Sequence, residues 1–235
     1  MLKRWEELPD LMRTAACREY YDVLWSRRRM LLIKRIFDVV MSLFLLLLFS
    51  PLFLLLALAI RLDSKGPVFY RQTRVTQYGR LFRIHKFRSM IDGADRLGTQ
   101  VTVDHDSRVT RVGRLIRACR LDELGQLLDV LAGSMTLVGT RPEVPKYVEH
   151  YTPEMYATLL LPAGITSQAS ILYKDEAELL HGAQDADRVY IEEVLPQKMQ
   201  YNLAALRDFS CGADLRVMWK TVCAILERTD RAEER

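Results

Sequence analysis

A regularly spaced run of arginines leads directly into two neighbouring carboxylates, Asp122 and Glu123. The arginines occupy every third position, at Arg111, Arg114, Arg117 and Arg120. On a helix this spacing places the guanidinium groups around one side and at the helix exit. The carboxylates open the next predicted helix, where backbone N–H groups and the positive end of the dipole keep a carboxylate ionised and can also hold a phosphate. The segment therefore joins anions and cations at a place suited to phosphate binding.

Each half of this pattern also has an ordinary structural interpretation. A charge run is usually a solvated helix face, and a bare Asp-Glu pair usually matches the positive end of the helix dipole. The position of the run immediately before the acidic pair is what favours a functional site.

The elements that position this segment are predicted from turn-forming glycine and proline residues and from the periodicity of apolar residues. They are strands over residues 68–70, 81–87 and 135–138 and helices over 111–118 and 121–131. Gly66-Pro67 stands directly before the first strand and Gly79 shortly before the second, and we expect these two strands to pair as a hairpin. Five leucines in the second helix stand at helical spacing and are interpreted as core. Residues 91–106 are polar and predict a loop near the site, while the chain from residue 187 onward is predicted to be mostly helical.

An uncharged stretch of 22 residues, 39–60, is long enough to cross a bilayer but contains Ser50-Pro51 near its middle. Basic residues flank it on both sides, at Arg27, Arg28, Arg29, Lys34 and Arg35 and at Arg61, Lys65, Arg71 and Arg74. Because positive flanks favour the cytoplasm, both ends should lie on the same side of the membrane. Pro51 removes a backbone donor and Ser50 can satisfy a freed carbonyl, which permits a helix that enters, breaks and returns. We predict a re-entrant anchor, with a kinked spanning helix as the alternative.

The remaining chain is long enough for one globular domain. We divide the sequence into an N-terminal extension over residues 1–33, predicted to be helical, an anchor over 34–62 and one cytosolic domain over 63–235. The extension could lie on the membrane surface or form an additional surface helix, and the sequence does not decide between them. The predicted fold class is α+β, mainly helical with a small β-hairpin, anchored by an N-terminal re-entrant helix–break–helix.

Charge is distributed unevenly along the chain. Residues 61–120 carry 14 Lys and Arg against 5 Asp and Glu, a net charge of +9, whereas residues 121–235 carry 11 against 19, a net of −8. A basic segment directly after a membrane stretch indicates anionic headgroups or phosphorylated substrates. No nucleic-acid motif accompanies it, so we expect no nucleic-acid partner. The 4 cysteines and 4 histidines lack metal-type spacing, and reduced thiols fit a cytosolic compartment.

Six short motifs follow one another in a characteristic order. They are Lys34-Arg35-Ile36-Phe37-Asp38, Ser50-Pro51, Gly66-Pro67-Val68-Phe69-Tyr70-Arg71-Gln72, Lys86-Phe87-Arg88-Ser89-Met90, Leu121-Asp122-Glu123-Leu124 and Val138-Gly139-Thr140-Arg141-Pro142. In this order they resemble the bacterial sugar transferases, in particular the monotopic polyprenyl-phosphate phosphoglycosyl transferases. The likeness covers residues 34–222 and leaves the N-terminal extension outside it.

The resemblance implies an activity and a location. Enzymes of this family lie at the cytoplasmic face of the bacterial inner membrane, held among its lipids by a re-entrant helix. They transfer a sugar 1-phosphate from a nucleotide diphosphate sugar, here expected to be a UDP-sugar, to undecaprenyl phosphate and release a nucleoside monophosphate. This reaction is the first membrane step of polysaccharide or glycoconjugate synthesis. The sequence identifies neither the sugar nor the oligomeric state, so a homo-oligomer stays open.

Roles for individual residues also follow from the resemblance. It implies that Asp122 is the nucleophile that carries a covalent phosphosugar, and that Glu123 is a ligand of Mg²⁺. A carboxylate attacks an anionic pyrophosphate poorly unless the phosphate charge is neutralised by a metal or by arginine. The residues expected to bind substrate phosphates, or to lie beside them, are Lys86, Arg117, Arg141 and Asp187, to which we add Arg88.

The sequence departs from the family pattern at five places. Gly125 stands where proline is usual, Asp129 for asparagine, Ser134 for aspartate, Thr140 for proline and Pro162 for arginine. None of these departures touches the Asp122-Glu123 pair. They bear on the identity of the substrate and on efficiency more than on the class of reaction.

Two other classes of protein stay open. A catalytically inactive, membrane-tethered interaction protein could keep the fold, but the joint retention of Asp122, Glu123, Lys86, Arg117 and Arg141 argues against it. A basic membrane protein that binds nucleic acid would show a steep salt dependence of that binding, which we do not expect.

Overall fold

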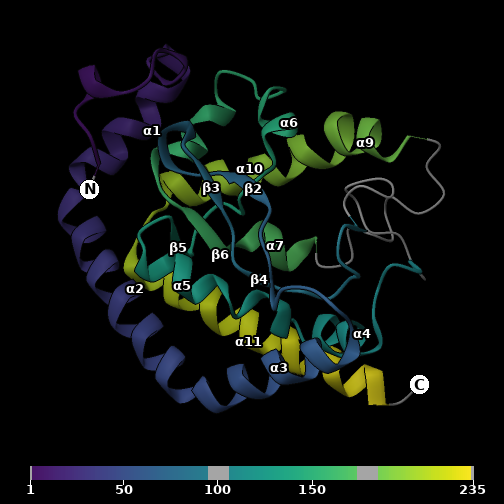
Figure 1. The fold of residues 1–235 in the computed structure, drawn as a ribbon. Helices are drawn as coiled ribbons and strands as arrows, with labels where there is room; N and C mark the ends of the chain where they lie inside the picture. The colour runs from purple at the N-terminus through teal and green to yellow at the C-terminus, as the bar shows by residue number, and fades with distance from the viewer. Residues whose placement is uncertain (1, 95–105, 174–184, 234–235) are drawn as a thin grey trace.

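The computed structural model describes residues 2–94, 106–173 and 185–233. The fold is mainly helical with small sheets, which confirms the predicted α+β class. The helices are α1 (Ala15–Ser26), α2 (Arg28–Leu48), α3 (Ser50–Asp63), α4 (Arg111–Ala118), α5 (Gln126–Leu131), α6 (Pro145–Val148), α7 (Gln168–Leu172), α9 (Ala186–Val189), α10 (Leu195–Arg207) and α11 (Cys211–Glu233) (Figure 1). Short 3-10 turns lie at Trp5–Glu7, Asp10–Met12, Gln77–Gly79, Leu121–Glu123 and Met155–Leu160, and a π-helical turn lies at Tyr190–Val194.

Each sheet of the described chain has two strands. β1 (Phe69–Tyr70) pairs antiparallel with β4 (Lys86–Phe87), β2 (Thr73–Val75) antiparallel with β3 (Leu81–Arg83), and β5 (Met135–Val138) parallel with β6 (Ala163–Thr166). The predicted pairing of residues 68–70 with 81–87 is confirmed at β1 and β4, but the second strand is divided. Between β3 and β4, Ile84 N donates to Gln72 O across the hairpin, whereas His85 N donates to the Asp129 carboxylate. Residues 95–105 of the predicted loop lie outside the described residues.

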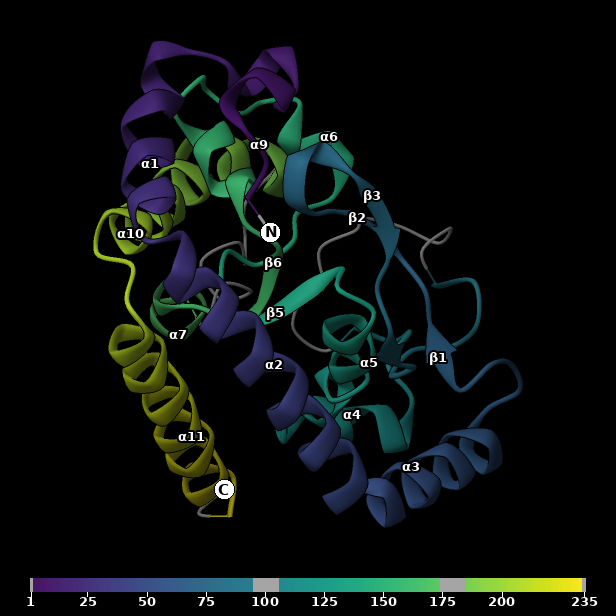
Figure 2. The ribbon, with the colours of Figure 1, turned by 90° about the vertical axis from the view of Figure 1, so that its left-hand side faces the viewer.

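Helices α2 and α3 form a bent pair at an angle of 62°. The chain breaks at Phe49, and the Ser50 hydroxyl donates to Leu47 O at 2.8 Å, as expected where proline frees carbonyls. In Figure 2, α2 runs diagonally down the molecule and α3 turns away at its lower end. Among the described residues no single helix is long and apolar enough to cross a membrane, although the bent pair together meets that test of length and composition. The predicted break is therefore confirmed.

The outer face of the bent pair is covered by exposed apolar side chains. They include Ile33, Ile36, Val40, Leu43, Phe44, Leu47, Leu48, Leu54, Leu55, Leu58 and Leu62. Monomeric soluble proteins rarely expose an apolar surface of this extent, so this face requires an apolar partner.

The beginning of α2 is joined to the domain by buried polar groups. Lys34 Nζ lies 2.6 Å from Asp214 Oδ2 of α11 and 3.9 Å from Asp38 Oδ1. Asp38 is 2% exposed and accepts hydrogen bonds from the Thr136 hydroxyl and, at 3.3 Å, from Leu137 N. Because these groups are buried, they must be satisfied in place, and they fix α2 against β5 and α11.

A second polar contact joins α2 to α5. The Arg35 guanidinium donates to Val130 O at 2.7 Å and to Leu131 O at 3.2 Å, and so caps the last turn of α5. The bent pair is consequently not a detached tail, because its first turns hold the helix that follows the candidate site.

The N-terminal extension forms part of the main hydrophobic core. Helix α1 is confirmed, but the extension also contains two 3-10 turns, and its last residues already belong to α2. Cys17, Tyr20, Tyr21 and Leu24 of α1 are buried in one cluster with side chains of α10 and of the Met155–Leu160 turn. Helix α1 therefore packs one apolar face on the domain, while Arg18 and Asp22 on its outer face are exposed.

Candidate active site

Asp122 and Glu123 lie in a tight turn between two helices. Helix α4 ends at Ala118, Arg120 adopts a left-handed conformation with φ 54°, and the 3-10 turn Leu121–Glu123 follows. The prediction of one helix over 121–131 is wrong in this detail, because α5 begins only at Gln126. Of the five leucines interpreted as core, Leu127 is fully buried and the others are partly buried. The carboxylates thus precede α5 and do not occupy its first turn.

Lys86 is the cation that contacts Asp122. Its Nζ lies 2.8 Å from Asp122 Oδ2 and 3.9 Å from Glu123 Oε1. The pairing of Lys86 with Tyr70 across β4 and β1 places this side chain beside the Leu121–Glu123 turn. Asp122 is only 4% exposed, so an ionised Asp122 depends on this contact to offset its lost hydration.

Arg141 forms a hydrogen-bonded ion pair with Glu123. Its guanidinium donates to Glu123 Oε1 at 2.5 Å, while Arg120 approaches Glu123 Oε2 to 3.9 Å from the other side. Burial raises the pKa of the Glu123 carboxyl, but the positive charges of Arg141 and Lys86 together lower it to about 2. Glu123 is therefore ionised throughout the physiological range.

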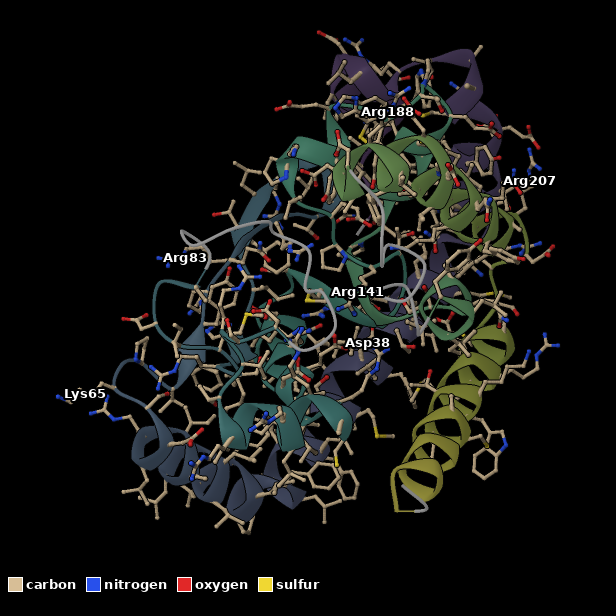
Figure 3. All side chains as sticks on the ribbon, turned by 90° about the vertical axis from the view of Figure 1, so that its right-hand side faces the viewer. Asp38, Lys65, Arg83, Arg141, Arg188 and Arg207 are labelled. Atoms are coloured by element: carbon tan, nitrogen blue, oxygen red, sulfur yellow. The ribbon has the colours of Figure 1, made fainter. Side chains whose placement is uncertain are left out.

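The loop that carries Arg141 is fixed by the parallel strands and by a buried network. Gly139 N donates to Thr166 O at 2.9 Å, and Gly164 N donates to Thr140 O at 2.8 Å. These two glycine backbones approach so closely that a Cβ on Gly164 would lie 2.2 Å from Gly139 N. In Figure 3, Arg141 lies toward the middle of the molecule, whereas Lys65 projects from the end of α3 at its edge.

Three buried polar residues behind this loop were not singled out from the sequence. The Tyr190 hydroxyl donates to Glu143 Oε1 at 2.7 Å and accepts from Lys198 Nζ at 2.9 Å. Arg74 donates to Pro142 O at 3.0 Å and completes the support of this segment. The only signal in the sequence is that Glu143 follows the Arg141-Pro142 motif directly, while its partners are far along the chain.

Arg88, which we expected to bind substrate phosphates, lies outside the cluster of Lys86, Asp122, Glu123 and Arg141 in this structure. The side chain is 4% exposed and donates to the carbonyls of Ile60, Ser64 and Lys65. Desolvation by burial lowers the pKa of this guanidinium, whereas hydrogen bonds to carbonyl oxygens favour its charged form. Arg88 follows the last residue of β4, and its side chain caps the C-terminal end of α3 through the carbonyls of Ile60 and Ser64.

Arg117 and Asp187 are placed differently from Lys86 and Arg141. Arg117 lies half-buried in the last turn of α4; the pKa of Asp106 is lowered mainly by hydrogen bonds from Arg108 and to a smaller extent by the charge of Arg117. Asp187 accepts hydrogen bonds from Lys146 Nζ and the Tyr147 hydroxyl, both at 2.6 Å. The structure thus brings Asp122, Glu123, Lys86 and Arg141 into one cluster.

The cluster fits Mg²⁺ only if a substrate phosphate supplies part of the coordination. Among the described residues there is no group of three or more acidic, cysteine or histidine side chains that could hold a metal by themselves. Magnesium is usually held by one or two carboxylates together with water and substrate phosphates. The adjacent carboxylates of Asp122 and Glu123 match that donor set, provided that a phosphate supplies the remaining ligands.

Comparison with known proteins gives matches that agree with one another, because the matched family and two of the relatives are named as sugar or sugar-phosphate transferases. The family model described as bacterial sugar transferase matches residues 29–228. A UDP-N-acetylgalactosamine-undecaprenyl-phosphate N-acetylgalactosaminephosphotransferase of Aeromonas hydrophila is 39% identical over 83% of this chain and 44% of its own length. A UDP-glucose:undecaprenyl-phosphate glucose-1-phosphate transferase of Caulobacter vibrioides is 38% identical over 85% of this chain and 71% of its own length.

A third relative is of similar length to the matched region. The exopolysaccharide production protein PSS of Rhizobium leguminosarum is 34% identical over 84% of this chain and 97% of its own length. By contrast, the chain spans less than half the length of the Aeromonas relative.

Glu123 should make stability depend on pH within a definite window. Because its pKa falls from 4.5 to about 2 on folding, its contribution is complete above pH 4.5 and is lost as pH falls toward about 2. We expect wild type to melt at a higher temperature than Glu123→Gln near neutral pH, and the difference to shrink steadily below pH 4.5. Circular dichroism in detergent measures both, with Asp22→Asn, from an exposed pair on α1, as the control. A difference that stays constant through the window would contradict the prediction.

Proposed function

Because the chain belongs to the bacterial sugar transferase family, we propose that it transfers a sugar 1-phosphate from a nucleotide diphosphate sugar to undecaprenyl phosphate. The donor class is a UDP-sugar, in keeping with the names of the Aeromonas and Caulobacter relatives. Those two names carry different sugars, so the sugar itself is open. The reaction is the first membrane step of polysaccharide synthesis, and the Rhizobium relative is named for exopolysaccharide production.

The observation that carries the proposal is the buried contact between Lys86 and Asp122 beside the Glu123–Arg141 pair. A nearly buried carboxylate next to two cations is suited to bind an anionic diphosphate. The two cations can exchange their contacts with the carboxylates for contacts with phosphate oxygens. The primary test is a panel of UDP-sugars incubated with purified protein, Mg²⁺ and undecaprenyl phosphate and scored for UMP release. No release with any donor would reject the proposal.

The reaction proceeds in two displacements at phosphorus. In the first, a carboxylate oxygen of Asp122 attacks the sugar-side phosphorus, the bond to the bridging oxygen breaks, and nucleoside monophosphate leaves with the electron pair. In the second, an oxygen of undecaprenyl phosphate attacks the same phosphorus and the bond to Asp122 breaks, which restores the carboxylate. Lys86 and Arg141 bind the phosphate oxygens on which charge develops.

Glu123 would hold Mg²⁺ together with the donor diphosphate. The bound ion supplies neutralisation of phosphate charge, as divalent ions do in phosphoryl transfer. The role of Arg141 is to orient Glu123 in the free enzyme and to bind phosphate oxygens once the donor has entered, since its side chain contacts Glu123 and is still 33% exposed.

Membrane attachment is by the bent pair α2–α3, entering and leaving on the cytoplasmic side of the inner membrane. Support comes from the 62° bend, the exposed apolar face and the basic residues at both ends of the pair. This arrangement puts the candidate site next to the bilayer surface, where the head group of undecaprenyl phosphate lies.

An inactive, membrane-tethered interaction protein is the alternative function. The clustering of Asp122, Glu123, Lys86 and Arg141 disfavours it, because an inactive chain has no need to keep two adjacent carboxylates buried among cations. The UDP-sugar panel separates the two functions directly.

Both ends of the bent pair should be inaccessible from outside the cell. We expect an impermeant maleimide to label neither Met30→Cys nor Lys65→Cys in intact cells, and to label both after permeabilisation. Substitution of Ser50 and Pro51 together by alanine should straighten the break and expose one end, since alanine restores the helical hydrogen bond. Labelling of only one position in the parent chain would establish a spanning helix.

Turnover should require a divalent cation. We expect EDTA to abolish UMP release and Mg²⁺ or Mn²⁺ to restore it, because both are hard cations suited to carboxylate and phosphate oxygens. Glu123→Gln should raise the Mg²⁺ concentration needed for half-maximal activity by about tenfold or more, because the variant lacks one charged ligand of the ion. Full turnover in metal-free buffer would remove Glu123 from its assigned role.

Asp122→Asn should separate covalent catalysis from binding. The variant keeps the shape of the side chain but lacks the nucleophilic oxygen, so it should fold and bind UDP-sugar while losing nearly all turnover. Wild type should become labelled by donor carrying radioactive phosphosugar before the acceptor is added, and should release the label when undecaprenyl phosphate arrives. Absence of bound label in rapid-quench experiments, with intersecting double-reciprocal lines, would instead indicate direct transfer in a ternary complex.

A further inference from the structure

The pairs β1–β4 and β2–β3 follow one antiparallel register, and His85 lies between β3 and β4, immediately before Lys86. Ile84 N donates to Gln72 O at 3.0 Å, and Lys86 pairs with Tyr70. The intervening His85 has no strand partner for its N–H group, which donates instead to Asp129 Oδ2 at 2.8 Å. A side chain from α5 therefore takes the place of a neighbouring strand at the residue before Lys86.

The same carboxylate also holds the His85 ring. His85 Nδ1 lies 2.7 Å from Asp129 Oδ1, and Nε2 lies 2.6 Å from a guanidinium nitrogen of Arg71. Arginine can only donate, so Nε2 must accept and Nδ1 must carry the hydrogen that is donated to Asp129. The Phe69 ring stands at 90° to the imidazole, with the ring centres 5.7 Å apart. His85 is thus fixed on three sides and in one tautomer.

Asp129 links the two elements that carry the cluster. It is 3% exposed and belongs to α5, whose preceding turn bears Asp122 and Glu123, while its partner His85 adjoins Lys86. Gly125 permits the close approach of these elements, because a Cβ at this position would lie 2.9 Å from His85 O and 3.1 Å from the Phe69 ring. The departure at Gly125 and that at Asp129 therefore belong to one structural arrangement.

We propose that His85 and Asp129 are positioning residues that set Lys86 against Asp122. The inference rests on the proposed function for its kinetic consequences, whereas the geometry of the pair stands independently of it. A carboxylate offers two acceptors, one for His85 N and one for Nδ1–H. An amide at position 129 offers one acceptor and one donor, so it would impose the Nε2–H tautomer and bring that hydrogen against the donor of Arg71. The segment before Lys86 would then have to move.

The tautomer is tested without any assay of activity. With ¹⁵N-labelled histidine we expect one of the 4 histidines to show the Nδ1–H form, its signal to vanish in His85→Ala and to change to the Nε2–H form or to disappear in Asp129→Asn. A His85 signal of the Nε2–H form in wild type would overturn the pairing. This outcome is independent of whether any UDP-sugar is turned over.

The kinetic test compares Asp129→Asn with Asp22→Asn, which removes an exposed carboxylate far from the cluster along the chain. We expect Asp129→Asn to lower kcat by about tenfold, the effect of a catalytic cation misplaced within a preserved site, while the KM for UDP-sugar changes by less than about threefold. Asp22→Asn should match wild type. A kcat within about twofold of wild type for a folded Asp129→Asn would overturn the positioning role.

A double-mutant cycle identifies the route of the effect. If Asp129 acts through Lys86, then Asp129→Asn should lower kcat by a far smaller factor in a Lys86→Arg background than in wild type. If the effects of the two substitutions on the logarithm of kcat were fully additive, Asp129 would act by another route and the proposal would be overturned. If wild type itself released no UMP with any donor, the proposed function would fail, and the tautomer measurement would still decide the geometry of the pair.

Discussion

Burying two adjacent carboxylates is the constraint on which the rest of this structure depends. Asp122 and Glu123 lose most of their hydration, and a buried charge is tolerated only when opposite charges and hydrogen bonds replace water. The compensating cations come from separate segments: Lys86 from β4, Arg120 from the turn itself and Arg141 from the loop after β5. The strand pairs and short helices can therefore be understood as the means of bringing these charges together.

The sequence predicted the elements whose causes are local. The bounds of α4 and β5 and the break between α2 and α3 follow from nearby helix caps, apolar runs and a Ser-Pro pair. A resemblance whose motifs are short and ordered also singled out Lys86, Arg141, Asp122 and Glu123, which lie together in the structure. Their roles in chemistry stay predictions.

What the sequence could not predict depends on partners distant in the chain. The N–H group of His85 finds its acceptor on Asp129, 44 residues later, and Arg88 donates to carbonyls at the end of α3. Cys17, Tyr20, Tyr21 and Leu24 stand at helical spacing on α1, but this periodicity does not identify α10 as the partner of the apolar face. In each case the local pattern can be read from the sequence, whereas the distant partner cannot.

The contact between Lys34 and Asp214 also constrains the order of events during biosynthesis. The two residues are 180 positions apart, so at ordinary rates of translation of about 5–20 residues per second Lys34 waits roughly ten to forty seconds for its partner. The partners of Arg35 on α5 and of Asp38 on β5 are made during that interval, whereas Lys34 must stay hydrated until α11 follows. The apolar part of the helix pair can enter the bilayer early, but the contact that completes the seating of its base forms only after nearly the whole chain has been made.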